Sequence, residues 1–384
     1  MIYLDNAATS WPKPAVVAQA IGQFLETSAA NPGRSGHRLS LAAARVVYNL
    51  REALAEFFGL EDPLRLVFTS GVTESVNLAL RGLLRPGDHV VTSPIEHNAV
   101  MRPLRALERE GVRLTIVPGT ANGCLRLGDL ELSLRPETRL VVLNHASNVS
   151  GTILPVAEVG AITRRQGKLL LVDAAQTAGV LPIDMKAMNV DLLAFSGHKG
   201  LLGPTGTGGL AIGERVDVRD MAPLKRGGTG SRSEFEEQPD FLPDKYEAGT
   251  PNSVGLAGLA ASLDFLRQRG TEALRRHEMT LTGQLLEGLR AISGVRVFGP
   301  CDPARQVAVV SFTLTGRHVS DIALQLDEEH GVLCRPGLHC APAAHRTLGS
   351  FPEGTVRFSP GAFTTAKEVE AALAAVARLA RAPT

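Results

Sequence analysis

DLLAFSGHKG (191–200) joins an apolar run of strand length to a turn of small and polar residues that contains a lysine. A buried strand that ends in such a turn is typical of an open α/β sheet, where ligands bind beyond the carboxyl ends of the strands. Similar apolar runs occur on both sides of it, and helical patterns separate most of them. These runs are LRLVF (64–68), HVVT (89–92), RLTIV (113–117), RLVVL (139–143), KLLLV (168–172) and GGLAI (208–212). The sequence therefore predicts an α/β fold with a mostly parallel central sheet.

Polar segments follow five of these runs directly. They are TSGVTES (69–75), SPIEHNA (93–99), NHASNVSG (144–151), DAAQ (173–176) and SGHK (196–199). Because the carboxyl ends of parallel strands meet at one edge of a sheet, we expect these segments to form one rim. Generic loop polarity is the alternative, but it does not explain this choice of Thr, His, Asn, Asp, Gln, Ser and Lys.

Composition narrows the class of protein. The chain has 384 residues, of which 44% are hydrophobic and 21% charged, and this is typical of a folded enzyme. The net charge of +1 favours a small-molecule substrate over nucleic acid or an anionic membrane. No apolar stretch approaches the roughly 18 residues of a membrane helix, and the start MIYLDNAAT does not have the pattern of a signal peptide. Four sparse cysteines suit a reducing compartment, so we expect a cytoplasmic protein.

The length favours one larger and one smaller domain. The segment 226–240 is rich in Gly and acidic residues and is expected to be irregular. A long helix over 252–270 would lead into the second domain, with strands at 308–314 and 355–359.

Lys199 is one of only seven lysines, in a chain whose Lys and Arg total 40. An amine can form a Schiff base with an aldehyde, which a guanidinium cannot do. Ser196 and His198 beside it offer donors for a phosphate, whereas no GK[ST] follows the glycines as a Walker P-loop would require.

Asp173 and Thr73 complete a set of three groups at successive strand ends. Asp173 would emerge from a buried strand and need a partner, such as a protonated pyridine nitrogen; a salt bridge or a helix cap is the alternative. Thr73 follows a Gly turn that opens a helix, where free N–H groups favour a phosphate. A lysine, a carboxylate and a phosphate cradle together describe a pyridoxal phosphate site.

At this point the chain resembles a class V aminotransferase-fold enzyme of the SufS-like cysteine desulfurase type, whose members sometimes also act as selenocysteine lyases. The resemblance extends over nearly the whole chain in nine ordered segments. They are YLDNAAT (3–9), SGVTESVN (70–77), EHNA (96–99), SNVSG (147–151), VDAAQ (172–176), SGHK (196–199), EAGTPN (247–252), RPGLHCAP (335–342) and TVRFSPG (355–361).

The resemblance implies three sets of functional residues. The catalytic residues are Lys199, Cys340 and His97. The cofactor-binding residues are Thr73, His97, Asn148, Asp173, Gln176, Ser196, His198, Lys199 and Thr250. The substrate-binding residues are Asn148, Arg335 and Arg357. No metal site is expected.

Individual roles follow from the same resemblance. Lys199 would bind pyridoxal 5'-phosphate covalently, Asp173 would pair with its ring nitrogen and Gln176 with its ring hydroxyl. His97 would stack on the ring, and Thr250 would reach the phosphate from a neighbouring subunit. Phosphate contacts from the same subunit would come from Thr73, Ser196 and His198.

Cys340 is implied as the nucleophile, in a mobile loop bounded by Gly and Pro. It would take sulfur from L-cysteine, or selenium from L-selenocysteine, give L-alanine and hand a persulfide to an acceptor protein or small thiol. The resemblance further implies a homodimer, a large cofactor-binding domain over 13–255, and a small domain formed by 1–12 and 256–384.

Other interpretations remain open. The segment CRPGLHCAPAAH (334–345) could bind zinc through Cys334, His339, Cys340 and His345, although no C-x2-C pair is present. His339 could lower the pKa of the thiol or pack the loop. The same fold could also serve an aminotransferase in which Cys340 is incidental, or a non-catalytic sulfur carrier or scaffold protein. In NPGRSGHRLS (31–40) the chain departs from the tighter N-x-H-R-x-x-H of the relatives, with Pro32 and Gly33 before Arg34.

Overall fold

The computed structural model describes residues 1–33 and 35–381, so Arg34 of the unusual N-terminal segment lies outside the described residues. A seven-stranded sheet in the order β2-β8-β7-β6-β5-β3-β4 forms its centre. Strand β8 runs antiparallel to both neighbours, and the other pairings are parallel. The strands are β2 (Leu66–Thr69), β3 (His89–Thr92), β4 (Arg113–Ile116), β5 (Thr138–Asn144), β6 (Leu169–Asp173), β7 (Leu192–Ser196) and β8 (Gly208–Ile212).

Helices cover both faces of this sheet, which explains why its central strands are apolar throughout. Along β5, Leu140 and Val142 pack on the face covered by α3 and α4, whereas Val141 and Leu143 pack on the opposite face. That second face is covered by α2, α5, α6 and α7. The helices of this part are α1 (Ala15–Thr27), α2 (Arg38–Phe57), α3 (Val72–Leu83), α4 (Asn98–Arg109), α5 (Leu127–Ser133), α6 (Val156–Arg165) and α7 (Ser253–Arg269).

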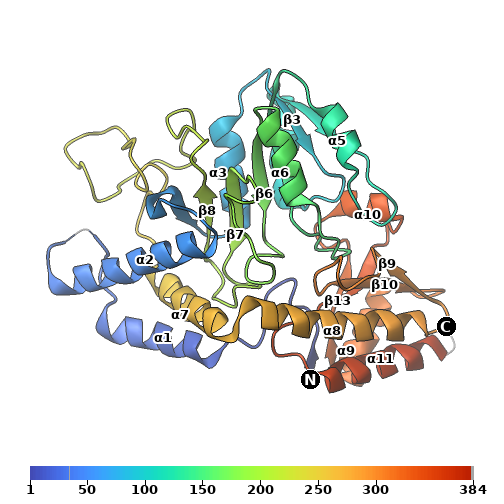
Figure 1. Ribbon diagram of the computed structural model, residues 1–384. Coiled ribbons are helices and arrows are strands. Elements are labelled where there is room, and N and C mark those ends of the chain that lie inside the picture. The colour runs from blue at the N-terminus through green and yellow to red at the C-terminus, as the bar shows by residue number, and fades with distance from the viewer. Residues whose placement is uncertain (34, 382–384) are drawn as a thin grey trace.

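A second layer of structure is built from the C-terminal third (Figure 1). An antiparallel sheet in the order β12-β13-β10-β9 packs against α8, α9 and α11. Strand β1 (Ile2–Tyr3), from the other end of the chain, pairs in parallel with β11 (Val332–Leu333), and Leu4 joins the same core. The remaining elements are α8 (Thr271–Arg290), β9 (Val295–Phe298), β10 (Val310–Leu314), α9 (Val319–His330), β12 (Arg335–Gly337), α10 (Pro342–Leu348), β13 (Thr355–Phe358) and α11 (Ala366–Arg381).

The predicted fold class is confirmed, since every predicted strand of the large sheet is present within two residues of its expected ends. The expected long helix is α7, which packs against α1 and α2, as Figure 1 shows. Segment 226–240 contains neither helix nor strand. The domain boundary at 255/256 stays a prediction. In the described ranges no helix combines the length and apolar character that crossing a membrane requires.

Candidate active site

A pocket of about 840 Å³ lies at the rim formed by the carboxyl ends of β5, β6 and β7 and by the N-termini of α3 and α4. Eight of the predicted site residues line it together. They are Thr73, His97, Asn148, Asp173, Gln176, Ser196, His198 and Lys199. The expectation that polar strand ends converge at one edge is therefore met.

The first turn of α3 forms one wall of the pocket. Gly71 has φ +146°, and a Cβ there would lie 3.3 Å from Ser196 Oγ, which is a tight contact. The Val72 N–H donates to Ser196 Oγ (3.1 Å), so β7 holds the start of the helix in place. Thr73 follows within the first turn, where unpaired N–H groups and the helix dipole attract an anion. This wall is a suitable phosphate cradle.

Lys199 carries its amine into the same pocket. The pKa of Lys199 is lowered to about 8, mainly by burial and also by the positive charges of Arg357 and Arg335, while Asp173 opposes the shift. A substantial neutral fraction near physiological pH is what imine chemistry and proton abstraction require of a lysine. Burial likewise lowers the pKa of His198 to about 4, so its ring is neutral.

Asp173 ends β6 and is 4% exposed. Its Oδ1 accepts the Ala175 N–H (2.8 Å), and among the described residues no ion pair to it is formed. Burial raises the pKa of Asp173, and Lys199 counteracts this. A buried carboxylate without a cationic partner is well placed to receive a protonated ring nitrogen.

His97 caps the N-terminus of α4, and its Nδ1 accepts the Ala99 N–H (3.0 Å). The ring proton therefore resides on Nε2. Burial lowers the pKa of His97 to about 4, with Lys199, Arg335 and Arg357 adding to the shift. A neutral imidazole of fixed tautomer is suited to stacking on a cofactor ring.

Pyridoxal phosphate fits these residues. Two amide oxygens and one ring nitrogen of the pocket wall are buried and have no hydrogen-bond partner in the described part of the chain: Asn144 Oδ1, Asn148 Oδ1 and His198 Nδ1. Buried polar atoms are nearly always paired, so such a cluster indicates a polar ligand. Gln176 donates through Nε2 to the Ala7 carbonyl (3.0 Å), which leaves its side-chain oxygen available.

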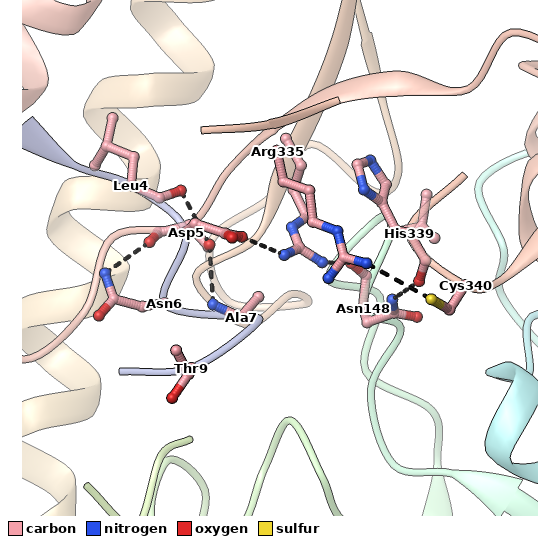
Figure 2. Close-up of polar contacts among 12 residues, drawn as sticks. Leu4, Asp5, Asn6, Ala7, Thr9, Asn148, Arg335, His339 and Cys340 are labelled. Carbon is pink, nitrogen blue, oxygen red and sulfur yellow. Dashed lines mark hydrogen bonds and ion pairs between the residues drawn. The ribbon is translucent and has the colours of Figure 1, made fainter. Parts of the chain in front are cut away.

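Cys340 lies in the short loop between β12 and α10, and it is exposed. Two hydrogen bonds attach this loop to the pocket wall: the Asn98 N–H donates to the Cys340 carbonyl (2.8 Å), and Asn148 Nδ2 donates to the His339 carbonyl (2.7 Å). Figure 2 shows Arg335 reaching toward the thiol, with Nη2 3.6 Å from Sγ. The backbone of this loop is thus attached next to the pocket, and the thiol is exposed rather than behind packed core, although Cys340 is not one of the residues that line the pocket.

The structure resolves the role of His339. Its ring is buried, and its Nε2 hydrogen-bonds to Thr355 Oγ1 (3.0 Å), so it faces away from the exposed thiol. Burial holds the pKa of His339 well below its usual value. These contacts favour the interpretation that His339 packs the loop.

The alternative zinc site is not assembled. The four cysteines are free thiols, and within residues 1–33 and 35–381 no three His, Cys, Asp or Glu side chains are placed to share a metal ion. Cys334 packs against the hydrophobic core of the C-terminal sheet and its helices, where burial raises the pKa of its thiol to about 12. His345 is buried and hydrogen-bonded to Ser350 Oγ (2.8 Å).

Arg357 lies next to this loop but is only 1% exposed. Its Nη2 pairs with Asp5 Oδ1 (2.6 Å) and its Nη1 donates to the Asn148 carbonyl (3.0 Å). The guanidinium of Arg357 therefore bridges the Asp5 carboxylate and the Asn148 backbone. Arg357 is therefore hydrogen-bonded to Asn148, and Asn148 is hydrogen-bonded to the loop that carries Cys340.

Thr250 does not line this pocket. It lies in a wider depression of about 1520 Å³ that also includes Gly33, Tyr48 and Lys225. Glu74 borders both spaces and pairs with Lys225 (2.6 Å). The structure thus places Thr250 outside the cluster formed by the other cofactor-binding candidates.

Sequence reasoning missed three charged groups at the site. Asp5 appeared only inside the YLDNAAT segment, and Lys13 only in the lysine count. Glu96, just before His97, is fully buried; burial raises its pKa to about 8, and Asp173 adds to the shift. The only sequence signal for these residues was their position in or next to the quoted segments.

Comparisons with known proteins agree with this geometry. The sequence pattern of the family described as Aminotransferase class-V matches residues 2–372. A "Probable cysteine desulfurase" from Methanothermobacter thermautotrophicus is 36% identical over 374 residues, which cover 96% of this chain and 92% of the relative.

Two solved structures are similar throughout. The apo structure of a cysteine desulfurase from Thermococcus onnurineus NA1 has a TM-score of 0.93 and 36% identity, covering 99% of this chain and 94% of the other. The S-sulfonic acid form of the cysteine desulfurase CsdA from Escherichia coli has a TM-score of 0.85 and 31% identity, with 98% and 94% covered.

Proposed function

This chain belongs to the class-V aminotransferase family, and from that premise we infer that it is an enzyme of the cysteine desulfurase type. The observation that carries this inference is the placement of Cys340. The loop that carries this exposed thiol accepts hydrogen bonds, through the backbone carbonyls of Cys340 and His339, from Asn98 and Asn148 beside a pocket that contains a partly neutral lysine.

We propose that pyridoxal 5'-phosphate occupies this pocket. Lys199 would hold it covalently, Asp173 would pair with its ring nitrogen, and His97 and Gln176 would contact its ring. Thr73, Ser196 and His198 would hold the phosphate, and Thr250 would contribute from the second subunit of a homodimer. When bound, the cofactor would withdraw electrons from the α-carbon of the substrate.

Lys199 would serve as the base at that carbon. Its amine, with a pKa of about 8, accepts the α-proton and can then donate that proton to another atom in the pocket. The neutral His97 ring lines the same pocket. Asn148, Arg335 and Arg357 are the proposed contacts for the substrate carboxylate.

Cys340 would perform the step that defines the reaction. Its thiolate attacks the sulfur of L-cysteine, a sulfur–sulfur bond forms, and the carbon–sulfur bond of the substrate breaks. The β-carbon of the substrate keeps the electron pair of the broken bond and takes up a proton. The products are L-alanine and a persulfide on Cys340. L-selenocysteine is the proposed alternative substrate, and a protein or small thiol the proposed acceptor.

The test is to incubate purified, cofactor-loaded protein with L-cysteine, quantify alanine by chromatography and map the persulfide by mass spectrometry. We expect alanine equimolar with the transferred sulfur and a mass increase on Cys340. Cys340→Ala should retain the cofactor but form neither product, whereas Cys301→Ala, which removes another free thiol, should behave as the natural protein.

Two results would contradict the proposal. Normal alanine and sulfide formation by Cys340→Ala would remove the thiol from the reaction. Formation of a keto acid from the amino acid substrate would instead identify an aminotransferase.

A further inference from the structure

A second cavity adjoins Lys199, between the large sheet and the C-terminal layer. Its volume is about 540 Å³, and both Lys199 and Gln176 line it as well as the candidate active site. Ala7, whose carbonyl accepts the Gln176 side chain (3.0 Å), belongs to its wall. The C-terminal layer contributes α8 and the segments 307–309 and 360–362. Lys199 therefore borders two spaces, the active-site pocket and this interlayer cavity.

Glu278 of α8 is a buried carboxyl group on the wall of the interlayer cavity, with only 9% of the residue exposed. In the described part of the chain its carboxylate forms no hydrogen bond and no ion pair, although buried polar groups are nearly always paired. The cavity is much larger than the roughly 30 Å³ that a water molecule occupies in the liquid, and Asn6, Ser10 and Gln176 add polar groups to its wall. Water in this cavity is thus the available partner for Glu278.

Lys199 and Glu278 are the only titratable residues that line the cavity in the described part of the chain. Burial raises the pKa of Glu278 to about 7, and Arg275 of the same helix is the one charged group that acts against this shift. Arg275 Nη2 donates to the Pro303 and Gln306 carbonyls (2.8 and 2.7 Å) and not to Glu278. The pKa of Lys199 is lowered to about 8. Two groups with such similar pKa values can exchange a proton at little cost in free energy.

The proposed reaction supplies Lys199 with protons that it must pass on. Its amine takes the α-proton, and each turnover also moves a proton from the Cys340 thiol to the β-carbon of the substrate. The cofactor and the substrate would occupy the active-site pocket, so they would compete with water there. The interlayer cavity lies outside that pocket, and a proton route through it would leave the substrate undisturbed.

We propose that Glu278 is a proton-relay residue, which exchanges protons with the Lys199 amine through water in the interlayer cavity. This inference rests on the proposed function, because Lys199 is the base of that reaction. The Lys199 ammonium group gives a proton to a water molecule, that water gives one of its own protons to the Glu278 carboxylate, and Glu278 releases it to solvent. Only N–H and O–H bonds break and form, so no further reactant is required. Glu278 acts through Lys199 and does not touch the substrate.

Proton exchange at Lys199 can be measured without turnover, by nuclear magnetic resonance of the full chain free of cofactor and labelled with ¹⁵N-lysine. The chain has only seven lysines, and the Lys199 signal is the one that Lys199→Met lacks. Glu278→Gln should slow the exchange of the Lys199 ammonium protons with water about tenfold or more at about pH 7. Glu272→Gln is the matched control on α8: that exposed carboxylate pairs with Arg276 (3.7 Å), and its loss should not change the exchange.

Chemical rescue tests the relay in the cofactor-loaded protein. Glu278→Ala should lower kcat for alanine formation from L-cysteine about tenfold or more. Formate is small enough to take the place of the missing carboxyl group and should restore much of this loss, whereas sodium chloride at the same ionic strength should not. Glu278→Gln should lose kcat without rescue, because its amide still fills the space. A purely structural role of Glu278 would not respond to formate.

Two results would overturn the relay: unchanged proton exchange at Lys199 in Glu278→Gln, or a loss of kcat in Glu278→Ala that formate does not restore. If Glu278→Ala does not fold, the exchange rate in the nearly isosteric Glu278→Gln decides alone. Failure of the natural protein to form alanine from cysteine would overturn the proposed function instead. The exchange measurement uses no substrate, so it would still decide whether Glu278 relays protons to Lys199.

Discussion

The ammonium group of Lys13 lies 2.8 Å from the carbonyl oxygen of His198, the residue that precedes Lys199. The same oxygen accepts hydrogen bonds from Thr9 Oγ1 and from the N–H and Oγ of Ser10. Burial lowers the pKa of Lys13 to about 8, and its amine also contacts Ser10 Oγ (2.7 Å). A segment that follows β1 thus fixes the peptide bearing the candidate catalytic lysine.

Lys13→Met should lower the free energy of unfolding by about 1–3 kcal/mol, because it removes a hydrogen bond from a charged, half-buried donor. It should also lower kcat more than it raises KM, since the Lys199 peptide loses part of its support. Urea denaturation and steady-state kinetics measure the two effects. Lys168→Met is the matched control: that exposed amine also donates to a carbonyl, of Pro136 (2.7 Å), but far from the pocket. Equal effects of both substitutions would argue against a role for Lys13 at the site.

Asp173→Asn should weaken binding of pyridoxal phosphate about 10- to 100-fold, because it replaces a charge-assisted hydrogen bond by a neutral one. Equilibrium dialysis against the cofactor gives the dissociation constant. Asp191→Asn is the control, since Asp191 is equally buried on the same sheet but pairs with Arg215 (3.3 Å). Retention of full cofactor affinity by Asp173→Asn would refute the assigned ring-nitrogen contact.

Glu247→Gln should lower the free energy of unfolding by about 3–5 kcal/mol, because it leaves Arg51 buried and without a counter-charge. Arg51 is 4% exposed and forms two hydrogen bonds to the Glu247 carboxylate (2.7 and 2.8 Å). Glu56→Gln breaks an exposed pair with Arg267 instead and should cost less than about 1 kcal/mol. Comparable losses in the two variants, measured by urea denaturation, would contradict this ranking.

Glu96 should make the protein less stable as the pH rises. The pKa of Glu96 in the folded state is about 8, above its ordinary value of 4.5, so the folded state keeps a proton that the unfolded chain releases. The contribution of Glu96 to the free energy of unfolding should therefore fall between about pH 4.5 and pH 8. Glu96→Gln should reduce this slope in urea denaturation series; Glu278, whose pKa burial raises to about 7, retains a slope of the same sign. An unaltered slope would show that Glu96 is ionised in the folded protein.

Buried histidines should lower the stability of the folded protein at acidic pH. Burial lowers the pKa values of His97, His145 and His345 to about 4, below their ordinary value of 6.5. Below pH 6.5 these histidines bind protons in the unfolded chain but not in the folded state, so their contribution to stability should decline as the pH falls toward 4. Thermal unfolding midpoints between pH 7 and pH 4 test this, and His145→Gln should reduce the decline.

The large sheet could be predicted because its strands are covered on both faces, which produces short apolar runs such as that of β5. The residues at the rim of the sheet could be predicted from the strand ends. A charged residue such as Asp173 or Lys199 directly after a buried strand indicates a ligand site. The antiparallel direction of β8 could not be predicted, because GGLAI is equally apolar in either orientation.

Contacts between distant segments were also beyond prediction. The pairing of Asp5 with Arg357 depends on the bridge between Asp5 and Ser359, which a linear pattern does not contain. His339 remained ambiguous for the same reason: its orientation is set by Thr355 on a neighbouring strand. Local patterns identified candidate groups, whereas the pairings among them required the folded chain.

The bond between Asp5 and Arg357 joins positions 352 residues apart. During synthesis the amino-terminal partner leaves the ribosome long before the carboxyl-terminal one, and domains generally begin to fold as they emerge. The segment around Asp5 must therefore stay accessible until the segment around Arg357 has left the ribosome, so the site cannot be completed before β13 has been synthesised.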